Sequence, residues 1–68
     1  MKIKVNGKEE VLEDSMKLSE YVSISLNGKE PRGIAVALND FIIPKQKWES
    51  VLINENDSIE IVHAVQGG

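Results

Sequence analysis

Residues 1–12 read MKIKVNGKEEVL, and this stretch decides how the rest of the chain can be arranged. Ile3 and Val5 alternate with lysines, which is the period of two expected of a strand with one buried face and one wet face. Asn6 and Gly7 follow, and both residue types accept the positive φ angles of a type I′ turn. The next apolar residues stand at hairpin distance. We therefore predict a β-hairpin over residues 1–12.

Downstream of the hairpin, residues 16–25 have the pattern of a short amphipathic helix. Leu18 and Val22 are spaced i, i+4, so they would share one buried face. Asp14-Ser15 offers an N-cap, because short polar side chains accept hydrogen bonds from the first free amides of a helix. Asn27-Gly28 favours a stop at the other end. We expect a helix near 16–25.

Three short strands are predicted in the second half of the chain. Residues 34–38, IAVAL, are apolar on both faces, which is typical of an interior strand that is also covered on its second side. Residues 41–43 form a short strand closed by Pro44, which lacks the amide proton a ladder needs. Residues 45–48 allow one helical turn, and residues 58–62 form the final strand.

The predicted order of hairpin, helix and three strands is an α+β arrangement in which one helix can cover one face of a sheet. The compact solution is a β-grasp, or ubiquitin-like, roll: a mixed sheet of four to five short strands with one main helix. Its first and last strands lie parallel at the middle of the sheet, linked by the long crossover. Since 68 residues allow one domain, we expect residues 1–68 to form it, with residues 63–68 as a flexible C-terminal tail.

Composition excludes several classes of function. The net charge is −3, whereas a nucleic-acid surface needs clustered positive charge. The longest apolar run has five residues against the roughly 20 of a membrane helix, and the first residues lack the apolar core of an export signal. We therefore expect a cytoplasmic protein. Because the chain has no cysteine and one histidine, it offers neither a thiolate nucleophile nor a metal-binding cluster.

A search for catalytic residues also fails. Ser58, His63 and Asp57 contain the residue types of a triad, but nothing in their spacing requires one. His63 is more simply interpreted as a surface residue at a strand end. We therefore predict that the chain is not an enzyme and binds no cofactor or metal of its own.

The chain ends in Gly67-Gly68, and this ending is the best candidate for chemistry. Two residues without a Cβ can approach backbone and phosphate closely, so they can pass a narrow channel into another protein's nucleotide site. There the terminal carboxylate can be converted by ATP into an acyl-adenylate, which sulfur or nitrogen nucleophiles can attack. The tail is then a substrate. A cloning remnant is the bland alternative.

Several segments resemble the ThiS-like sulfur carriers of thiamin (thiazole) biosynthesis, within the ThiS/MoaD branch of the ubiquitin-like proteins. They are IKVNG at 3–7, IAVALN at 34–39, IPKQKW at 43–48, and DSIEIV at 57–62 with the final Gly-Gly. The sequence departs from the family at Asn56, where Gly is common, and at Gln66, where a smaller or apolar residue is usual. The segment around the predicted helix is also poorer in leucine.

The resemblance implies a reaction sequence at the chain end. Gly68 would be adenylated by an E1-like, ThiF-like adenylyltransferase and converted to a thiocarboxylate with sulfur from a cysteine desulfurase or another donor. Sulfur would then pass to a ThiG-like thiazole synthase. Gly67 would give access, and Ala64, Val65 and Gln66 would line the partner's channel.

Partner contacts beyond the tail are expected at an exposed apolar patch that includes Phe41 and Val62. The thin core of so small a domain nevertheless favours burial of at least two of Phe41, Ile43 and Val62. Trp48 is expected to cap the core edge. We expect a monomer when the carrier is free.

Three alternative functions stay open at this point. The small subunit of molybdopterin synthase shares the fold and the Gly-Gly chemistry. A ubiquitin-like modifier would be joined to lysines by isopeptide bonds, and a plain binding domain would carry its glycines incidentally.

Overall fold

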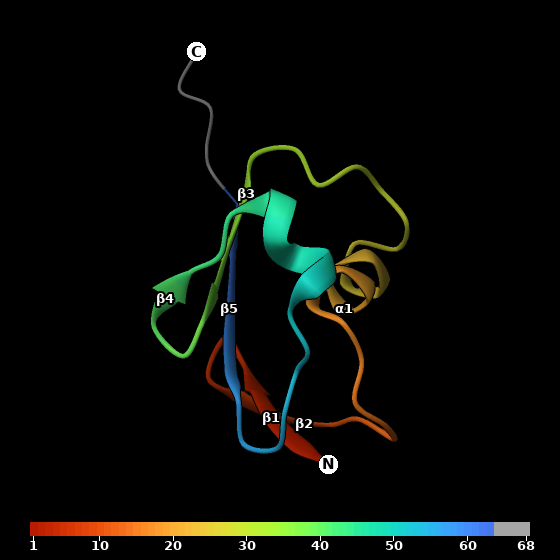
Figure 1. Cartoon of the computed structure of the whole chain (residues 1–68), viewed down its shortest axis with the longest axis vertical. Coiled ribbons are helices and arrows are strands. Elements are labelled where there is room, and N and C mark those ends of the chain that lie inside the picture. Colours follow the sequence, from red (N-terminus) through yellow and green to blue (C-terminus); the bar gives the residue numbers. More distant parts are fainter. Residues whose placement is uncertain (64–68) are drawn as a thin grey trace.

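The computed structural model describes residues 1–63, in which five strands form one mixed sheet of order β2-β1-β5-β3-β4. The elements are β1 (Lys2–Val5), β2 (Lys8–Val11), α1 (Leu18–Ser25), β3 (Ile34–Leu38), β4 (Phe41–Ile42), the 3-10 helix η1 (Lys45–Ser50) and β5 (Ser58–His63). Strands β1 and β5 are parallel, and the other pairs are antiparallel. Figure 1 shows α1 and η1 on the same side of the sheet. This is the predicted β-grasp roll.

The N-terminal hairpin forms as predicted. Asn6 and Gly7 have φ angles of 51° and 83°, the left-handed conformation that a type I′ turn requires of both central residues. The turn aligns Val5 with Lys8 and Ile3 with Glu10. Ile3 and Val5 therefore point into the core, while the lysines between them stay exposed.

The helix starts later than predicted, and its predicted cap is wrong. The Ser15 hydroxyl donates to the Ile53 carbonyl at 2.7 Å, so it is used in a tertiary contact and does not cap α1. Residues 16 and 17 are extended and pair with the 51–53 segment, where the Ile53 amide donates to the Met16 carbonyl at 2.9 Å. Helix α1 therefore begins at Leu18, and Glu20 accepts a hydrogen bond from the Lys17 amide at its N-terminus.

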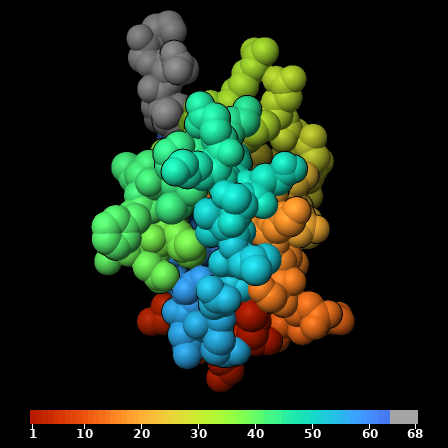
Figure 2. Space-filling model, in the orientation of Figure 1, coloured from red at the N-terminus to blue at the C-terminus, as the bar shows by residue number. Residues whose placement is uncertain are grey.

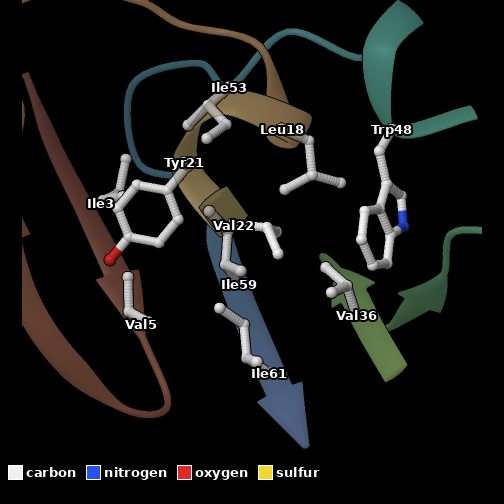
Figure 3. Close-up of a cluster of buried hydrophobic side chains, with 10 residues drawn as sticks. All are labelled: Ile3, Val5, Leu18, Tyr21, Val22, Val36, Trp48, Ile53, Ile59 and Ile61. Atoms are coloured by element: carbon white, nitrogen blue, oxygen red, sulfur yellow. The ribbon is translucent and has the colours of Figure 1, made fainter. Parts of the chain in front are cut away.

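The core lies between the sheet and the layer formed by α1 and η1. Figure 3 shows its ten buried side chains: Ile3, Val5, Leu18, Tyr21, Val22, Val36, Trp48, Ile53, Ile59 and Ile61. Trp48 comes from η1, is 5% exposed, and donates its Nε1 proton to the Ile43 carbonyl at 2.8 Å. Its predicted place at the core is confirmed.

The opposite face of the sheet has no covering layer among residues 1–63. Val36 of β3 is buried against α1 and η1, but its neighbour Ala35 is exposed on the other face. The prediction that this strand is covered on both sides was therefore wrong. The physical reason is that both helical segments lie on the same face of the sheet. No other described element is left to pack against the apolar residues of the outer face.

Smaller differences concern element length. Strand β4 has two residues instead of three. Ile43 lies just beyond it, although its amide still donates to the Val36 carbonyl at 2.9 Å. The single helical turn expected at 45–48 is the six-residue η1. Strand β5 includes His63, which pairs with Ile34 and so belongs to the sheet. From the sequence, His63 was predicted to lie in the tail.

Candidate functional site: the end of the central strand and its outer face

The start of β5 is fixed by a hydrogen-bonded turn. Asp57 accepts from the Asn54 amide at 2.7 Å and from the Asn39 side-chain amide at 3.0 Å. The side-chain oxygen of Asn39 in turn accepts from the Ser58 amide at 2.9 Å. Asn39 thus ties the β3–β4 turn to the first residue of β5. No local sequence pattern indicated this role of Asn39, because its partners lie 18 and 19 residues away.

Two further asparagines hold β5 in place. Asn56 has a φ angle of 67°, in the left-handed region. Glycine adopts this region most easily and asparagine does so more readily than most other residues, so Asn fits at this position. The side-chain oxygen of Asn6 accepts from the Ile61 amide at 2.9 Å and continues the β1–β5 pairing beyond the end of β1. The turn role of Asn6 is readable from Asn-Gly, but this second role is not, since its partner is 55 residues away.

Strand β5 divides its side chains between the two faces. Ile59 and Ile61 are buried in the core at 0% and 8% exposure. Glu60 and Val62 point to the outer face and are exposed. His63 is exposed at the strand end, as predicted, and the chain continues from there. The predicted site residues of the tail, Ala64, Val65, Gln66, Gly67 and Gly68, lie outside the described residues.

An apolar patch flanks the end of β5 on the outer face, and we define it as Ala35, Ile42 and Val62. Phe41 lies opposite Leu38, which packs against the core, so Phe41 points to the other face of the sheet at its edge. Register places Ala35 opposite Val62 and Ala37 opposite Ile42, so three strands contribute. Ile42 is 75% exposed. Ala35, Ile42 and Val62 line a shallow hollow of about 290 Å³. Figure 2 shows the β3–β4 segment protruding at the edge of the molecule.

The predicted burial of two among Phe41, Ile43 and Val62 was wrong. Phe41 and Val62 are 73% and 57% exposed, and Ile43 is half-buried. Phe41 lies on a two-residue edge strand, and Val62 is on the uncovered face, so neither can reach the core. Both side chains are exposed, but they lie on opposite faces of the sheet: Val62 belongs to the outer-face patch and Phe41 does not.

No catalytic constellation forms within residues 1–63. Ser58 and His63 occupy opposite ends of β5, which at about 3.3 Å per residue separates them by roughly 16 Å. The described residues hold no cluster of three or more metal-ligating side chains. Of the helices that the structure describes, none has the length and apolar character to cross a bilayer.

One titratable group has an altered environment, and it lies on the helix side of the sheet. The Tyr21 hydroxyl donates to Glu10 Oε1 at 2.6 Å and so links α1 to the edge strand β2. Burial of the phenol, together with the hydrogen bond and negative charge of Glu10, raises the pKa of Tyr21 well above its ordinary value. This contact stabilises the fold and is remote from the patch.

The five-stranded mixed sheet with one main helix, in which β5 lies at the centre beside β1, is the β-grasp architecture of the ubiquitin-like class. The model of the ThiS family matches residues 2–68. The chain therefore belongs to the ThiS family, which confirms the family predicted from the sequence.

Solved structures agree on the fold. The crystal structure of the thiamine biosynthesis protein ThiS from Geobacter metallireducens superposes with a TM-score of 0.82 at 21% identity, covering all of both chains. The solution structure of a thiamine biosynthesis protein from the same organism gives 0.77 at 21% identity, covering all of this chain and 88% of that one.

Two curated relatives match parts of longer proteins. The chain is 34% identical over all 68 residues to a thiazole synthase of Paramagnetospirillum magneticum, of which it spans 20%. It is 46% identical over 35 residues to the uncharacterized protein ycf40 of Trieres chinensis, covering 52% of this chain and 48% of that protein. The chain thus spans half or less of the length of either relative.

Proposed function

We propose that this carrier transports sulfur as a thiocarboxylate at Gly68. In the first step a carboxylate oxygen of Gly68 attacks the α-phosphorus of ATP, an acyl-adenylate forms, and pyrophosphate leaves. In the second step hydrosulfide attacks the acyl carbon and AMP leaves, so one oxygen of the original carboxylate is replaced by sulfur. Where the donor is a persulfide, its outer sulfur attacks and AMP leaves, and a thiol then cleaves the resulting acyl disulfide, which releases the thiocarboxylate and leaves the thiol in a new disulfide with the donor. ATP and all catalytic side chains belong to partner enzymes.

The observation that carries this proposal is the position of β5. Its first two residues pair with β1, and residues 59–63 pair with β3, so the strand is held in the sheet up to the start of the tail and ends next to the exposed apolar patch. Gly68 lies six residues beyond Val62, and an extended chain covers at most about 3.3–3.6 Å per residue. A partner seated on the patch can therefore have its reaction centre up to about 20 Å away. Val62 on the patch and Phe41 at the sheet edge act as docking contacts.

The proposed partners act in sequence, in the cytoplasm. An E1-like adenylyltransferase activates Gly68, a cysteine desulfurase or another donor supplies sulfur, and a thiazole synthase accepts it. The thiazole synthase assignment is supported by the relative in which a segment similar to this chain is part of a protein of that name. In each complex Gly67 gives access, while Ala64, Val65 and Gln66 line the partner's channel.

Intact mass spectrometry tests the proposal. The carrier is incubated with its adenylyltransferase, ATP and a sulfur source, and we expect a mass gain that matches exchange of one oxygen for sulfur. A variant without Gly67 and Gly68, with unchanged circular dichroism, is the control and should gain nothing. Conjugates on lysines of other proteins would instead indicate a modifier, and an unchanged mass of the intact chain would refute the sulfur-carrier mechanism.

A further inference from the structure

We propose that Asp40 and Glu60, at the rim of the apolar patch, recognise a basic surface on the ATP-using enzyme that activates the chain end, and thereby set the rate of association. This inference rests on the proposed function, and it assigns the two carboxylates a role that the tail chemistry does not require. Asp40 and Glu60 both line the hollow that contains Ile42 and Val62.

The fold places both carboxylates on the outer face. Glu60 lies on β5 opposite Ala37 of β3, and Ala37 is in turn opposite Ile42. Asp40 stands in the β3–β4 turn with φ 73°, a left-handed conformation that costs energy for any residue other than glycine. Both residues are exposed. Within residues 1–63, the ion pair that forms joins Arg32 to Glu30 and involves neither of them.

The carboxylates without another role in the second half of the chain lie at this rim. Residues 35–68 contain two basic and five acidic side chains. Of the five, Asp57 is engaged in its turn and Glu55 accepts from the Lys2 amide at 2.9 Å. Glu49 lines a separate hollow between α1 and η1. The remaining two, Asp40 and Glu60, both border the patch.

The other half of the outer face is electrostatically different. Lys2 and Lys4 of β1 are exposed there, and Lys4 stands directly opposite Glu9 of β2. Cross-strand pairs of opposite charge compensate one another. Over β1 and β2 the outer face therefore carries two lysines, one carboxylate and the exposed Val11, whereas over β3, β4 and β5 it is apolar with an acidic rim. This asymmetry gives a partner one preferred orientation.

The chemistry of adenylation identifies the partner. An enzyme that adenylates Gly68 must hold the triphosphate of ATP beside the terminal carboxylate, which requires lysine or arginine side chains at the inner end of the channel that receives the tail. A channel lined by one sign of charge focuses its field, so positive potential extends to its entrance. Charges of opposite sign around an apolar contact act mainly on the association rate and on orientation, with a smaller effect on affinity. The acidic rim thus complements the surface around that entrance.

Association kinetics with the cognate adenylyltransferase test the inference. In the Asp40→Asn/Glu60→Gln variant we expect the association rate constant at low ionic strength to fall about three- to tenfold, with little change in the dissociation rate constant. The difference should shrink as added salt shortens the Debye length. The matched control is Glu9→Gln/Glu49→Gln, which changes the net charge by the same amount away from the patch and should retain at least half of the original rate.

The outcomes separate the two proposals. If both double variants associate equally fast, or if the rim variant slows only association with thiazole synthase, the inference is wrong. Thiocarboxylate formation at saturating enzyme is measured in parallel, and we expect the rim variant to reach the same final mass as the unmodified sequence. If the unmodified sequence gains no sulfur, the proposed function fails, whatever the kinetics.

Discussion

The two faces of the sheet use the same strands for different purposes. On the helix side, Ile3 and Ile59 are 1% and 0% exposed beneath α1 and η1, whereas Val62 on the outer side is 57% exposed. Strand β5 supplies residues to both faces in strict alternation. Substitutions of inward-facing residues of β5 should therefore change the stability of the fold, and substitutions of outward-facing residues should change partner binding. Both effects can be measured on this one strand.

The largest effect is expected for Ile59→Ala. Removing a fully buried branched side chain from the central strand forfeits its burial and leaves a cavity, at a cost of about 2–5 kcal/mol. In a domain with so thin a core this is a large share of the total stability. Urea unfolding followed by circular dichroism measures it. A loss below about 1 kcal/mol would show that the inner face does not carry the fold.

A smaller loss is expected for Trp48→Phe, which tests the η1 side of the same core. Phenylalanine keeps an aromatic ring but cannot donate to the Ile43 carbonyl, and it leaves part of the indole volume empty. We expect the free energy of unfolding to fall by about 1–3 kcal/mol. An unchanged urea midpoint would mean that Trp48 only covers the core edge without stabilising it.

The outer face should respond in the opposite way to Val62→Ala. Because this side chain contacts no covering layer within residues 1–63, unfolding should change by no more than about 0.5 kcal/mol. Affinity for the adenylyltransferase should fall by about 1 kcal/mol, or roughly fivefold in Kd. Calorimetric titration and urea unfolding of one preparation measure both. Loss of stability with unchanged affinity would reverse the assignment of the two faces.

The smallest effect concerns the Tyr21–Glu10 contact between α1 and the edge strand. Folding raises the pKa of Tyr21, so the neutral phenol is favoured and its contribution is fully present below the unfolded value of about 10. That contribution is lost as the pH rises above 10. Tyr21→Phe should cost about 1 kcal/mol at pH 7, and its difference from the unmodified sequence should shrink above pH 10. Urea midpoints at pH 7 and at pH 11 measure this, and a constant difference would contradict it.

Local patterns predicted much of this fold. The hairpin followed from alternation and Asn-Gly, and the parallel pairing of first and last strands followed from the order of elements. The helix start was missed, because Ser15 bonds to Ile53 instead of capping α1. The role of Asn39 was missed for a similar reason: its partners Asp57 and Ser58 become neighbours only in the folded chain.

The candidate site also has one part that the sequence shows and another part that only the structure shows. The final glycines are visible in the sequence, and their chemistry stays a prediction because residues 64–68 lie outside the described part of the chain. The exposure of Val62 on the outer-face patch, and of Phe41 at the sheet edge, required the structure. An apolar side chain in a strand has the same sequence signature whether its own chain or a partner covers it.

The sequence by itself determined the order and alternation of the strands and singled out Gly67-Gly68 as the candidate for chemistry, because each depends on residues close together along the chain. Only the tertiary structure decided which face stays open and which carboxylates border it. The reason is geometric: α1 and η1 occupy one face of the sheet, and the side on which they pack leaves the other face of β5, with Glu60 and Val62, exposed.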